Sequence, residues 1–131
     1  MANEQLALAR TINPAQHAML DYGVAATFFS LGMRYRHRNG RAAALAFING
    51  AMVLGVSMLT DYPGGIWRKI RFRTHGKLDV AQAALAGLGP ILFGFAGEPE
   101  ARTFQMQALS EVGVIAMTDW DGQALPFEPA S

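Results

Sequence analysis

The stretch that decides the fold is residues 42–59, which read AAALAFINGAMVLGVSML. These 18 residues hold no charged side chain, and their polar side chains are Asn49 and Ser57. About 20 apolar residues in an α-helix cross the roughly 30 Å hydrocarbon core of a bilayer. The stretch is therefore predicted to form a membrane-spanning helix.

Three further segments share this character to different degrees. Residues 78–96 are interrupted near their start by Asp79, and residues 18–33 are shorter and carry Asp21. Residues 104–117 are the most polar, but their polar side chains fall largely on one side of a helix, as in a helix that faces its neighbours. We predict an all-α fold, a four-helix transmembrane bundle. A fourth helix that lies in the membrane interface and a soluble four-helix bundle are the alternatives.

The composition favours one small apolar domain without an active site. Of 131 residues, 51% are hydrophobic and 16% charged, against about 25% charged in an average soluble domain. The length predicts one domain over residues 1–131, and the net charge of +1 argues against a nucleic-acid partner. The absence of cysteine excludes disulfides and thiolate chemistry. Because no catalytic or nucleotide-binding motif occurs either, neither an enzyme nor a cofactor is expected.

The chain aligns with itself at an offset of 58 residues. Residues 17–21 (HAMLD) fall on residues 75–79 (HGKLD), and residues 60–62 (TDY) fall on residues 118–120 (TDW). This self-similarity predicts two tandem two-helix repeats. Because each repeat holds two helices, both copies enter the membrane from the same side, and the matching motifs share one membrane face. The predicted repeats cover about residues 12–64 and about residues 70–122.

These motifs resemble those of the SPW-repeat proteins, small bacterial membrane proteins named for a Ser-Pro-Trp triplet in each copy. The resemblance rests on His17-x-x-Leu20-Asp21-Tyr22, Leu59-Thr60-Asp61-Tyr62, Thr74-His75 with Leu78-Asp79, and Pro90-Ile91-Leu92-Phe93-Gly94-Phe95. At the naming triplet the chain departs from the family, because residues 31–33 read LGM and residues 89–91 read GPI. The resemblance implies a four-helix fold in the bacterial inner membrane and brings no established activity.

Two histidines and four aspartates are predicted to gather at one membrane face. Each histidine precedes an aspartate by four residues, which places the two side chains on one face of a helix. Such a group can tie helix ends together as a structural clamp, bind a divalent metal ion, or handle protons or solutes. We favour the clamp and predict no metal. The candidate ligands, if a metal binds, are His17, Asp21, Asp61, His75, Asp79 and Asp119.

Glu111 is a carboxyl group deeper in the predicted bundle, and its partner at the 58-residue offset is the apolar Val53. If the fourth helix spans the membrane, we expect Glu111 to be protonated or bonded to a neighbour such as Asn49. If that helix lies flat, Glu111 is solvated.

The linker between the repeats is basic and aromatic, and we predict that it lies on lipid headgroups. Its contact residues are predicted to be Trp67, Arg68, Lys69, Arg71 and Arg73. Basic residues flank both membrane faces almost equally, so the positive-inside rule gives only a slight preference, for cytoplasmic termini.

The leading functional hypothesis is a multi-pass protein of the bacterial inner membrane that acts as a non-enzymatic structural or accessory subunit. Its expected partners are membrane lipids and either another membrane protein or a second copy of itself. The alternative is a small transporter, or a metal- or proton-handling protein, that uses the His/Asp cluster.

Overall fold

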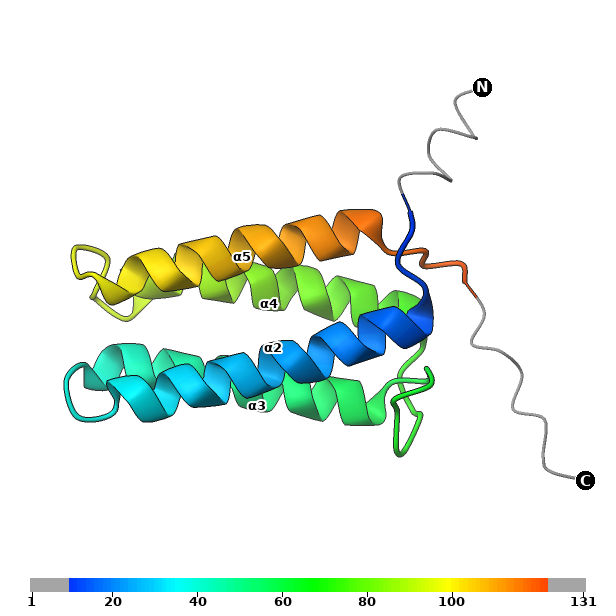
Figure 1. Cartoon of the computed structure of the whole chain (residues 1–131), viewed down its shortest axis with the longest axis horizontal. Coiled ribbons are helices and arrows are strands. Elements are labelled where there is room, and N and C mark those ends of the chain that lie inside the picture. Colours follow the sequence, from blue (N-terminus) through cyan, green and yellow to red (C-terminus); the bar gives the residue numbers. More distant parts are fainter. Residues whose placement is uncertain (1–9, 123–131) are drawn as a thin grey trace, which may run out of the picture.

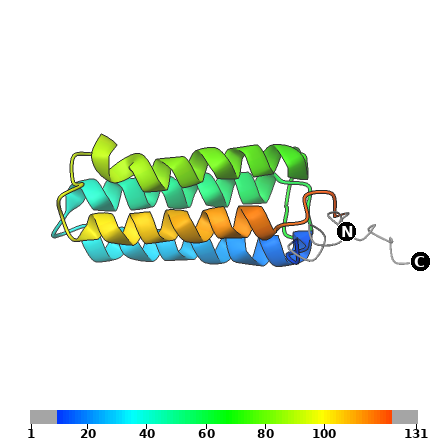
Figure 2. The ribbon, with the colours of Figure 1, turned by 90° about the horizontal axis from the view of Figure 1, so that it is seen from above.

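Four α-helices build the molecule in the computed structural model, which describes residues 10–122 (Figure 1). They are α2 (Pro14–Tyr35), α3 (Gly40–Leu59), α4 (Phe72–Leu92) and α5 (Glu100–Met117). The helices run side by side in alternating directions (Figures 1 and 2). α2 packs along α3, and α4 packs along α5. The predicted all-α four-helix bundle is therefore confirmed, with α5 as a member of the bundle.

Asparagine caps fix where the first two helices begin. The Asn13 side chain accepts a hydrogen bond from the backbone of Gln16, and the Gln16 side chain accepts one from the backbone of Asn13. Pro14 follows at the first helical position, where a missing N–H costs nothing. Asn39 accepts from the backbone N–H of Ala42 and caps α3 in the same way.

α4 ends at Leu92, before the end of the predicted segment 78–96. Pro90 lies in its last turn and is buried. The chain then turns at Gly94, whose φ of +76° is a left-handed conformation that glycine adopts without a steric penalty.

The apolar core fills the half of the bundle near the loops α2–α3 and α4–α5. Its largest members, Phe28, Phe95 and Phe104, are fully buried. Ring centroids lie 6.2 Å apart for Phe28 and Phe104 and 5.5 Å apart for Phe95 and Phe104. Aromatic pairs of this kind add about 0.5–1.5 kcal/mol each beyond the burial of their surface. The opposite half of the interior holds most of the buried polar side chains.

The outer surface of the bundle carries no charge along the middle of any described helix. Over residues 19–33, 42–59, 78–92 and 103–117, every exposed position holds an uncharged side chain. Large apolar side chains point outward there: Met19, Met33, Ile48, Leu88, Ile91, Leu92, Met106, Leu109 and Val112. Exposed charged side chains lie at the two ends of the bundle.

α3 is the described helix that is long and apolar enough to cross a membrane by length and composition. A buried helix of a soluble protein passes the same test. The other three helices contain more polar residues, several of which the bundle buries, including Asp21, Gln82 and Glu111. Average hydropathy does not record which way a polar side chain points, so these residues lower it even where the outer face of the helix is apolar.

Several boundaries and contacts recur at the 58-residue offset. α2 begins at Pro14 and α4 at Phe72, while α3 ends at Leu59 and α5 at Met117. Isolated backbone bridges join Ile12 to Thr118 and Ile70 to Thr60. The start of each helix hairpin is thereby tied to the end of the other.

Candidate functional site, a polar ring at one end of the bundle

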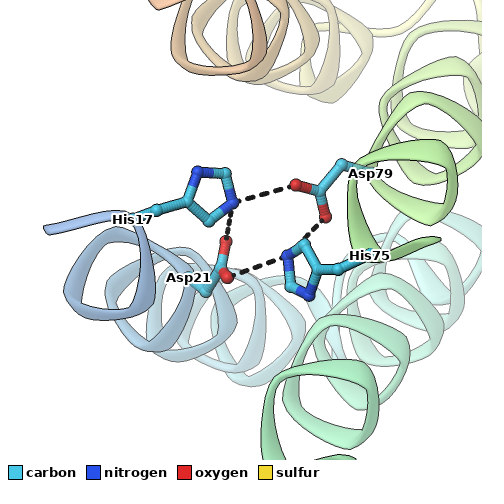
Figure 3. Close-up of side chains that lie close together, drawn as sticks. All are labelled: His17, Asp21, His75 and Asp79. Atoms are coloured by element: carbon cyan, nitrogen blue, oxygen red, sulfur yellow. Dashed lines mark hydrogen bonds and ion pairs between the residues drawn. The ribbon is translucent and has the colours of Figure 1, made fainter. Parts of the chain in front are cut away.

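Two histidines and two aspartates form a closed ring between α2 and α4 (Figure 3). Nε2 of His17 lies 3.3 Å from a carboxylate oxygen of Asp21 and 3.0 Å from one of Asp79. Nε2 of His75 lies 3.1 Å from the other oxygen of Asp21 and 3.0 Å from the other oxygen of Asp79. Each carboxylate therefore bridges both imidazoles. We call these four residues the His/Asp ring.

The ring is buried although all its members are polar. The two histidine side chains are each 1% exposed, and the side chains of Asp21 and Asp79 are 11% and 19% exposed. The four-residue spacing places His17 beside Asp21 on α2 and His75 beside Asp79 on α4, as the sequence predicts. Packing of α2 near α4 then lets each aspartate reach the histidine of the other hairpin.

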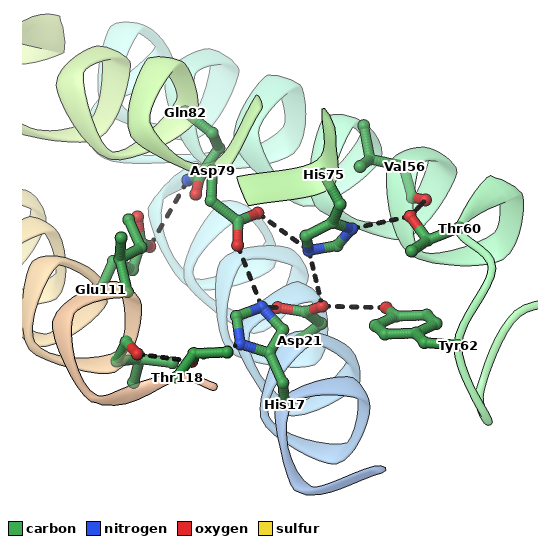
Figure 4. A network of polar contacts seen from close by, with 12 residues as sticks. His17, Asp21, Val56, Thr60, Tyr62, His75, Asp79, Gln82, Glu111 and Thr118 are labelled. Atoms are coloured by element: carbon green, nitrogen blue, oxygen red, sulfur yellow. Dashed lines mark hydrogen bonds and ion pairs between the residues drawn. The ribbon is translucent and has the colours of Figure 1, made fainter. Parts of the chain in front are cut away.

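The second nitrogen of each imidazole, Nδ1, contacts one threonine hydroxyl (Figure 4). Nδ1 of His17 lies 2.8 Å from Oγ1 of Thr118, and Nδ1 of His75 lies 2.7 Å from Oγ1 of Thr60. Each hydroxyl donates its one proton to a backbone carbonyl four residues earlier, at 2.6 Å. The hydroxyl therefore accepts from Nδ1–H, and both imidazoles carry a proton on Nδ1. Nε2 is the nitrogen that faces the ring.

Aromatic side chains complete the site unequally on its two sides. The buried Tyr62 donates its hydroxyl proton to Asp21 at 2.9 Å. Its counterpart at the 58-residue offset is Trp120, which packs edge-on against His17 with ring centroids 5.0 Å apart. The indole N–H of Trp120 donates to the carbonyl of Ile115 at 3.0 Å. Asp21 thus gains a hydrogen bond through Tyr62 that Trp120 does not supply to Asp79.

The two carboxylates stabilise the protonated, positively charged form of the buried histidines. Both histidines lie in the first turns of their helices, before the stretches whose exposed positions carry no charge. Burial disfavours the imidazolium form, but the adjacent carboxylates of Asp21 and Asp79 outweigh burial and raise the pKa of both histidines, that of His75 to about 9. Burial and the charge of Asp21 raise the pKa of Tyr62, so it remains a hydrogen-bond donor. With both imidazoles protonated, the ring holds two positive and two negative charges and is neutral.

A cavity of about 80 Å³ leads from the ring toward the middle of the bundle, where it reaches Gln82 and Glu111. Oε1 of the buried Glu111 lies 3.4 Å from the amide nitrogens of Gln82 and Gln107. Gln82 also donates to Oδ1 of Asn49 at 3.0 Å. The predicted link between Glu111 and Asn49 is therefore indirect, through Gln82.

The structure brings together four of the six predicted cluster residues and leaves out Asp61 and Asp119. Asp61 is exposed, and the Asp119 carboxylate accepts the backbone N–H of Asp121 at 3.2 Å. Both follow a threonine that caps a helix in extended backbone. Successive side chains of extended backbone point in opposite directions, so the threonine faces the histidine and the aspartate faces away. The role of the two threonines was not predicted. The sequence does show that a threonine stands both at position 60 and 58 residues later, at position 118.

The linker residues predicted to contact headgroups lie at the ring end of the bundle, in the loop before α4 and, for Arg73, in the first turn of α4 (Figure 1). Ile66 and Trp67 are 61% and 57% exposed. Arg68, Lys69, Arg71 and Arg73 are also exposed. Arg73 has a partner within the chain, because it forms an ion pair with Asp121.

No family model, curated protein or solved structure matches this chain. Its function is therefore inferred from the geometry of its own residues.

Proposed function

We propose that the chain is a multi-pass membrane protein whose four helices all cross the bilayer. The observation that carries this proposal is the charge-free outer surface along the middle of all four helices. These stretches contain 15 to 18 residues, which at 1.5 Å per residue extend about 22–27 Å, close to the hydrocarbon thickness of roughly 30 Å. Outward methionine, leucine and isoleucine side chains over an interior with buried histidine, aspartate and glutamate suit a lipid solvent.

The charged ends of the bundle support the same placement. Exposed arginines at positions 34, 36, 38 and 41 lie at one end, and the basic linker lies at the other. The linker loop with Trp67 is suited to the headgroup layer, where each basic side chain adds roughly 1 kcal/mol on anionic lipid.

The proposal includes the two parallel repeats and the relationship to the SPW-repeat proteins. Support comes from the 58-residue offset that relates the helix starts, the backbone bridges and the His–Thr contacts. The bacterial inner membrane, with both termini on the cytoplasmic side, is the location that goes with it.

Within the membrane we assign the chain a non-enzymatic structural or accessory role, beside another membrane protein or a second copy. Small residues on the outside of α3 support this role. Ala51 is exposed, and a Cβ atom added at Gly55 meets nothing within 4 Å. Close approach of helices in lipid depends on such small side chains, and packing inside the bundle does not use these two.

Single-cysteine labelling tests the membrane placement, because the natural chain has no cysteine. Arg36→Cys and Arg68→Cys should react with a membrane-impermeant maleimide from opposite sides of sealed inner-membrane vesicles. Leu109→Cys, in the middle of α5, should remain unreactive until the membrane is dissolved. Labelling of Arg36→Cys and Arg68→Cys from the same side would overturn the proposal. Labelling of Arg68→Cys from outside intact cells would show that the orientation is opposite to the proposed one, while the four membrane-spanning helices would stand.

Purification from native membranes after mild cross-linking tests the accessory role. A membrane protein or a second copy of the chain is expected to co-purify with the wild type and with the Gly23→Leu variant. Gly55→Leu should lose it. Gly23 is the matched control because a Cβ atom there also meets nothing within 4 Å. A stable monomer with no companion would contradict the accessory role.

A further inference from the structure

We infer that the His/Asp ring binds one divalent first-row transition metal ion, for which Zn²⁺ is the best match. The ligands are Nε2 of His17, Nε2 of His75 and the carboxylates of Asp21 and Asp79. This inference goes beyond the proposed function and does not rest on it, because the ring has the same geometry wherever the bundle resides.

The spacing of the four donor groups fits a small ion. One ligand atom from each residue lies within 4.8 Å of all the others. Neighbouring nitrogen and oxygen atoms around the ring are 3.0–3.3 Å apart. In a tetrahedral zinc site with bonds of about 2.0–2.1 Å, ligand atoms are roughly 3.3 Å apart. The contacts around the ring use both oxygens of each carboxylate, so the four side chains surround the ion once their ligand atoms close from separations of up to 4.8 Å toward this value.

The threonines orient both imidazoles as metal ligands. Because Nδ1–H donates to the hydroxyl of Thr118 or Thr60, a neutral imidazole keeps its lone pair on Nε2. That lone pair points toward the carboxylates. A hydrogen bond from the second ring nitrogen accompanies nearly every metal-binding histidine and fixes its tautomer. Tyr62 has the corresponding role for Asp21, whose carboxylate accepts its hydroxyl proton.

A proton on Nε2 leaves some of the polar contacts in the ring without a hydrogen bond, whereas a metal ion can bind all four side chains. Nε2 of His75 is buried and lies 3.0 and 3.1 Å from two carboxylate oxygens. Neither contact has the geometry of a hydrogen bond, and Nε2 has no other partner among the described residues. A single N–H cannot point at two carboxylates at once. An ion between the four residues contacts all of them.

The charge and chemistry of the donors select the class of ion. Two carboxylates and two neutral imidazoles carry a charge of −2, which one divalent cation cancels in a buried site. Imidazole nitrogen favours Zn²⁺ and its first-row neighbours, whereas Mg²⁺ and Ca²⁺ prefer oxygen ligands alone. Four protein ligands with no open position are typical of a structural zinc site. The ion would join α2 to α4.

Zinc binding by the purified full-length protein tests the inference. Protein stripped with a chelator is dialysed against ZnCl₂ or MgCl₂, and the bound metal is counted by mass spectrometry. The wild type should bind one Zn²⁺ and no Mg²⁺. His17→Ala/His75→Ala should weaken Zn²⁺ binding at least 100-fold. Asp61→Asn and His37→Ala, which alter residues outside the ring, should bind like the wild type.

A second variant keeps the test informative if the double alanine variant does not fold. Thr60→Val/Thr118→Val retains all four ligands and removes both partners of Nδ1, so zinc affinity should fall by about 10–100-fold. With Co²⁺ in place of Zn²⁺, the intense visible absorption of a tetrahedral site should appear in the wild type and shift in this variant. A wild type that binds no Zn²⁺, or an affinity unchanged in both variants, would overturn the inference and leave an imidazolium–carboxylate clamp.

Discussion

A threonine hydroxyl determines how each histidine of the ring is used. Thr60 and Thr118 accept a hydrogen bond from Nδ1–H and leave Nε2 to the carboxylates. Their hydroxyl protons are held by the last turn of α3 or α5, so the helix end sets the tautomer. At the residue scale, the ring thus depends on side chains that carry no charge and bind no ligand.

Replacement of Thr60 by valine should destabilise the protein. Valine has a similar shape but leaves the Nδ1–H of His75 buried without an acceptor, which costs about 1–3 kcal/mol. Thermal unfolding in detergent should show a lower midpoint for Thr60→Val, while Thr60→Ser stays close to the wild type. Thr74→Val, at an exposed position, is the control. Equal midpoints for the valine and serine variants at position 60 would argue against this role of the hydroxyl.

The metal-free protein should lose stability as the pH rises from about 6.5 to about 9. The folded pKa of His75 is raised to about 9, above its unfolded value of about 6.5. Its proton therefore stabilises the fold fully below the lower value, and this contribution disappears as the pH passes the upper one. The pKa of His17 is raised as well. The titratable and polar groups that face His75 are His17 and Asp21 from α2, Asp79 from α4, and Thr60 and Tyr62 after α3.

Unfolding midpoints measured in chelator at pH 6, 7.5 and 9 check this dependence. His75→Asn, which cannot take up the proton, should give a flatter profile. A wild-type midpoint that rises over the same interval would contradict the expected sign.

Sequence spacing predicts the ring in part. His17, Asp21, His75 and Asp79 could be placed together because the four-residue spacing and the 58-residue offset act on regular helices. The exclusion of Asp61 and Asp119 could not be predicted, because it depends on the direction of one side chain in the turn after a helix. The pairing of His17 with Thr118 required the packing of α2 against the end of α5.

At the scale of elements, helix ends were harder to predict than helices. Apolar segments indicated the four helices, although of these segments only residues 42–59 lack a charged side chain. Asn13 and Asn39 then extend α2 and α3 toward their amino ends by capping, which hydropathy does not report. α4 stops early because the chain reverses at Gly94.

The loop after α3 positions Thr60, and Gly65 allows it to close. A Cβ atom at residue 65 would lie 1.8 Å from the carbonyl oxygen of Thr60, so backbone must move. Gly65→Ala should therefore lower the unfolding midpoint, at a cost of about 1–3 kcal/mol, and weaken zinc binding. Gly97→Ala, where a Cβ atom meets nothing within 4 Å, is the matched control. Equal effects of the two substitutions would contradict the expectation that a side chain at position 65 displaces the backbone of Thr60.

At the scale of the whole molecule, the distribution of charge separates the bundle into a neutral outer band and two charged ends. Sequence alone left a soluble bundle open, because average hydropathy marks α3 and leaves the other helices ambiguous. The arrangement adds the direction of each polar side chain. Asp79 faces the ring and Glu111 is buried, so the outer faces of α4 and α5 carry no charge along their middle.

A lysine in the neutral band should impair membrane insertion. Leu109 is 67% exposed in the middle of α5, where a lysine costs about 2.5–3.5 kcal/mol in a bilayer. Leu109→Lys should accumulate less in the membrane fraction than Gly97→Lys, which places the same charge at the end of the bundle. Equal amounts of the two variants in the membrane would weigh against a lipid-facing α5.

The His–Thr contacts also set an order of events during synthesis. Thr118 lies more than one hundred residues after its partner His17, so the ribosome must finish α5 before Nδ1 of His17 gains its acceptor. Asp21 accepts the hydroxyl proton of Tyr62 within its own hairpin, whereas His17 requires the end of the last helix. A chain interrupted before α5 therefore leaves a buried imidazole nitrogen without the hydroxyl that accepts its proton in the complete fold.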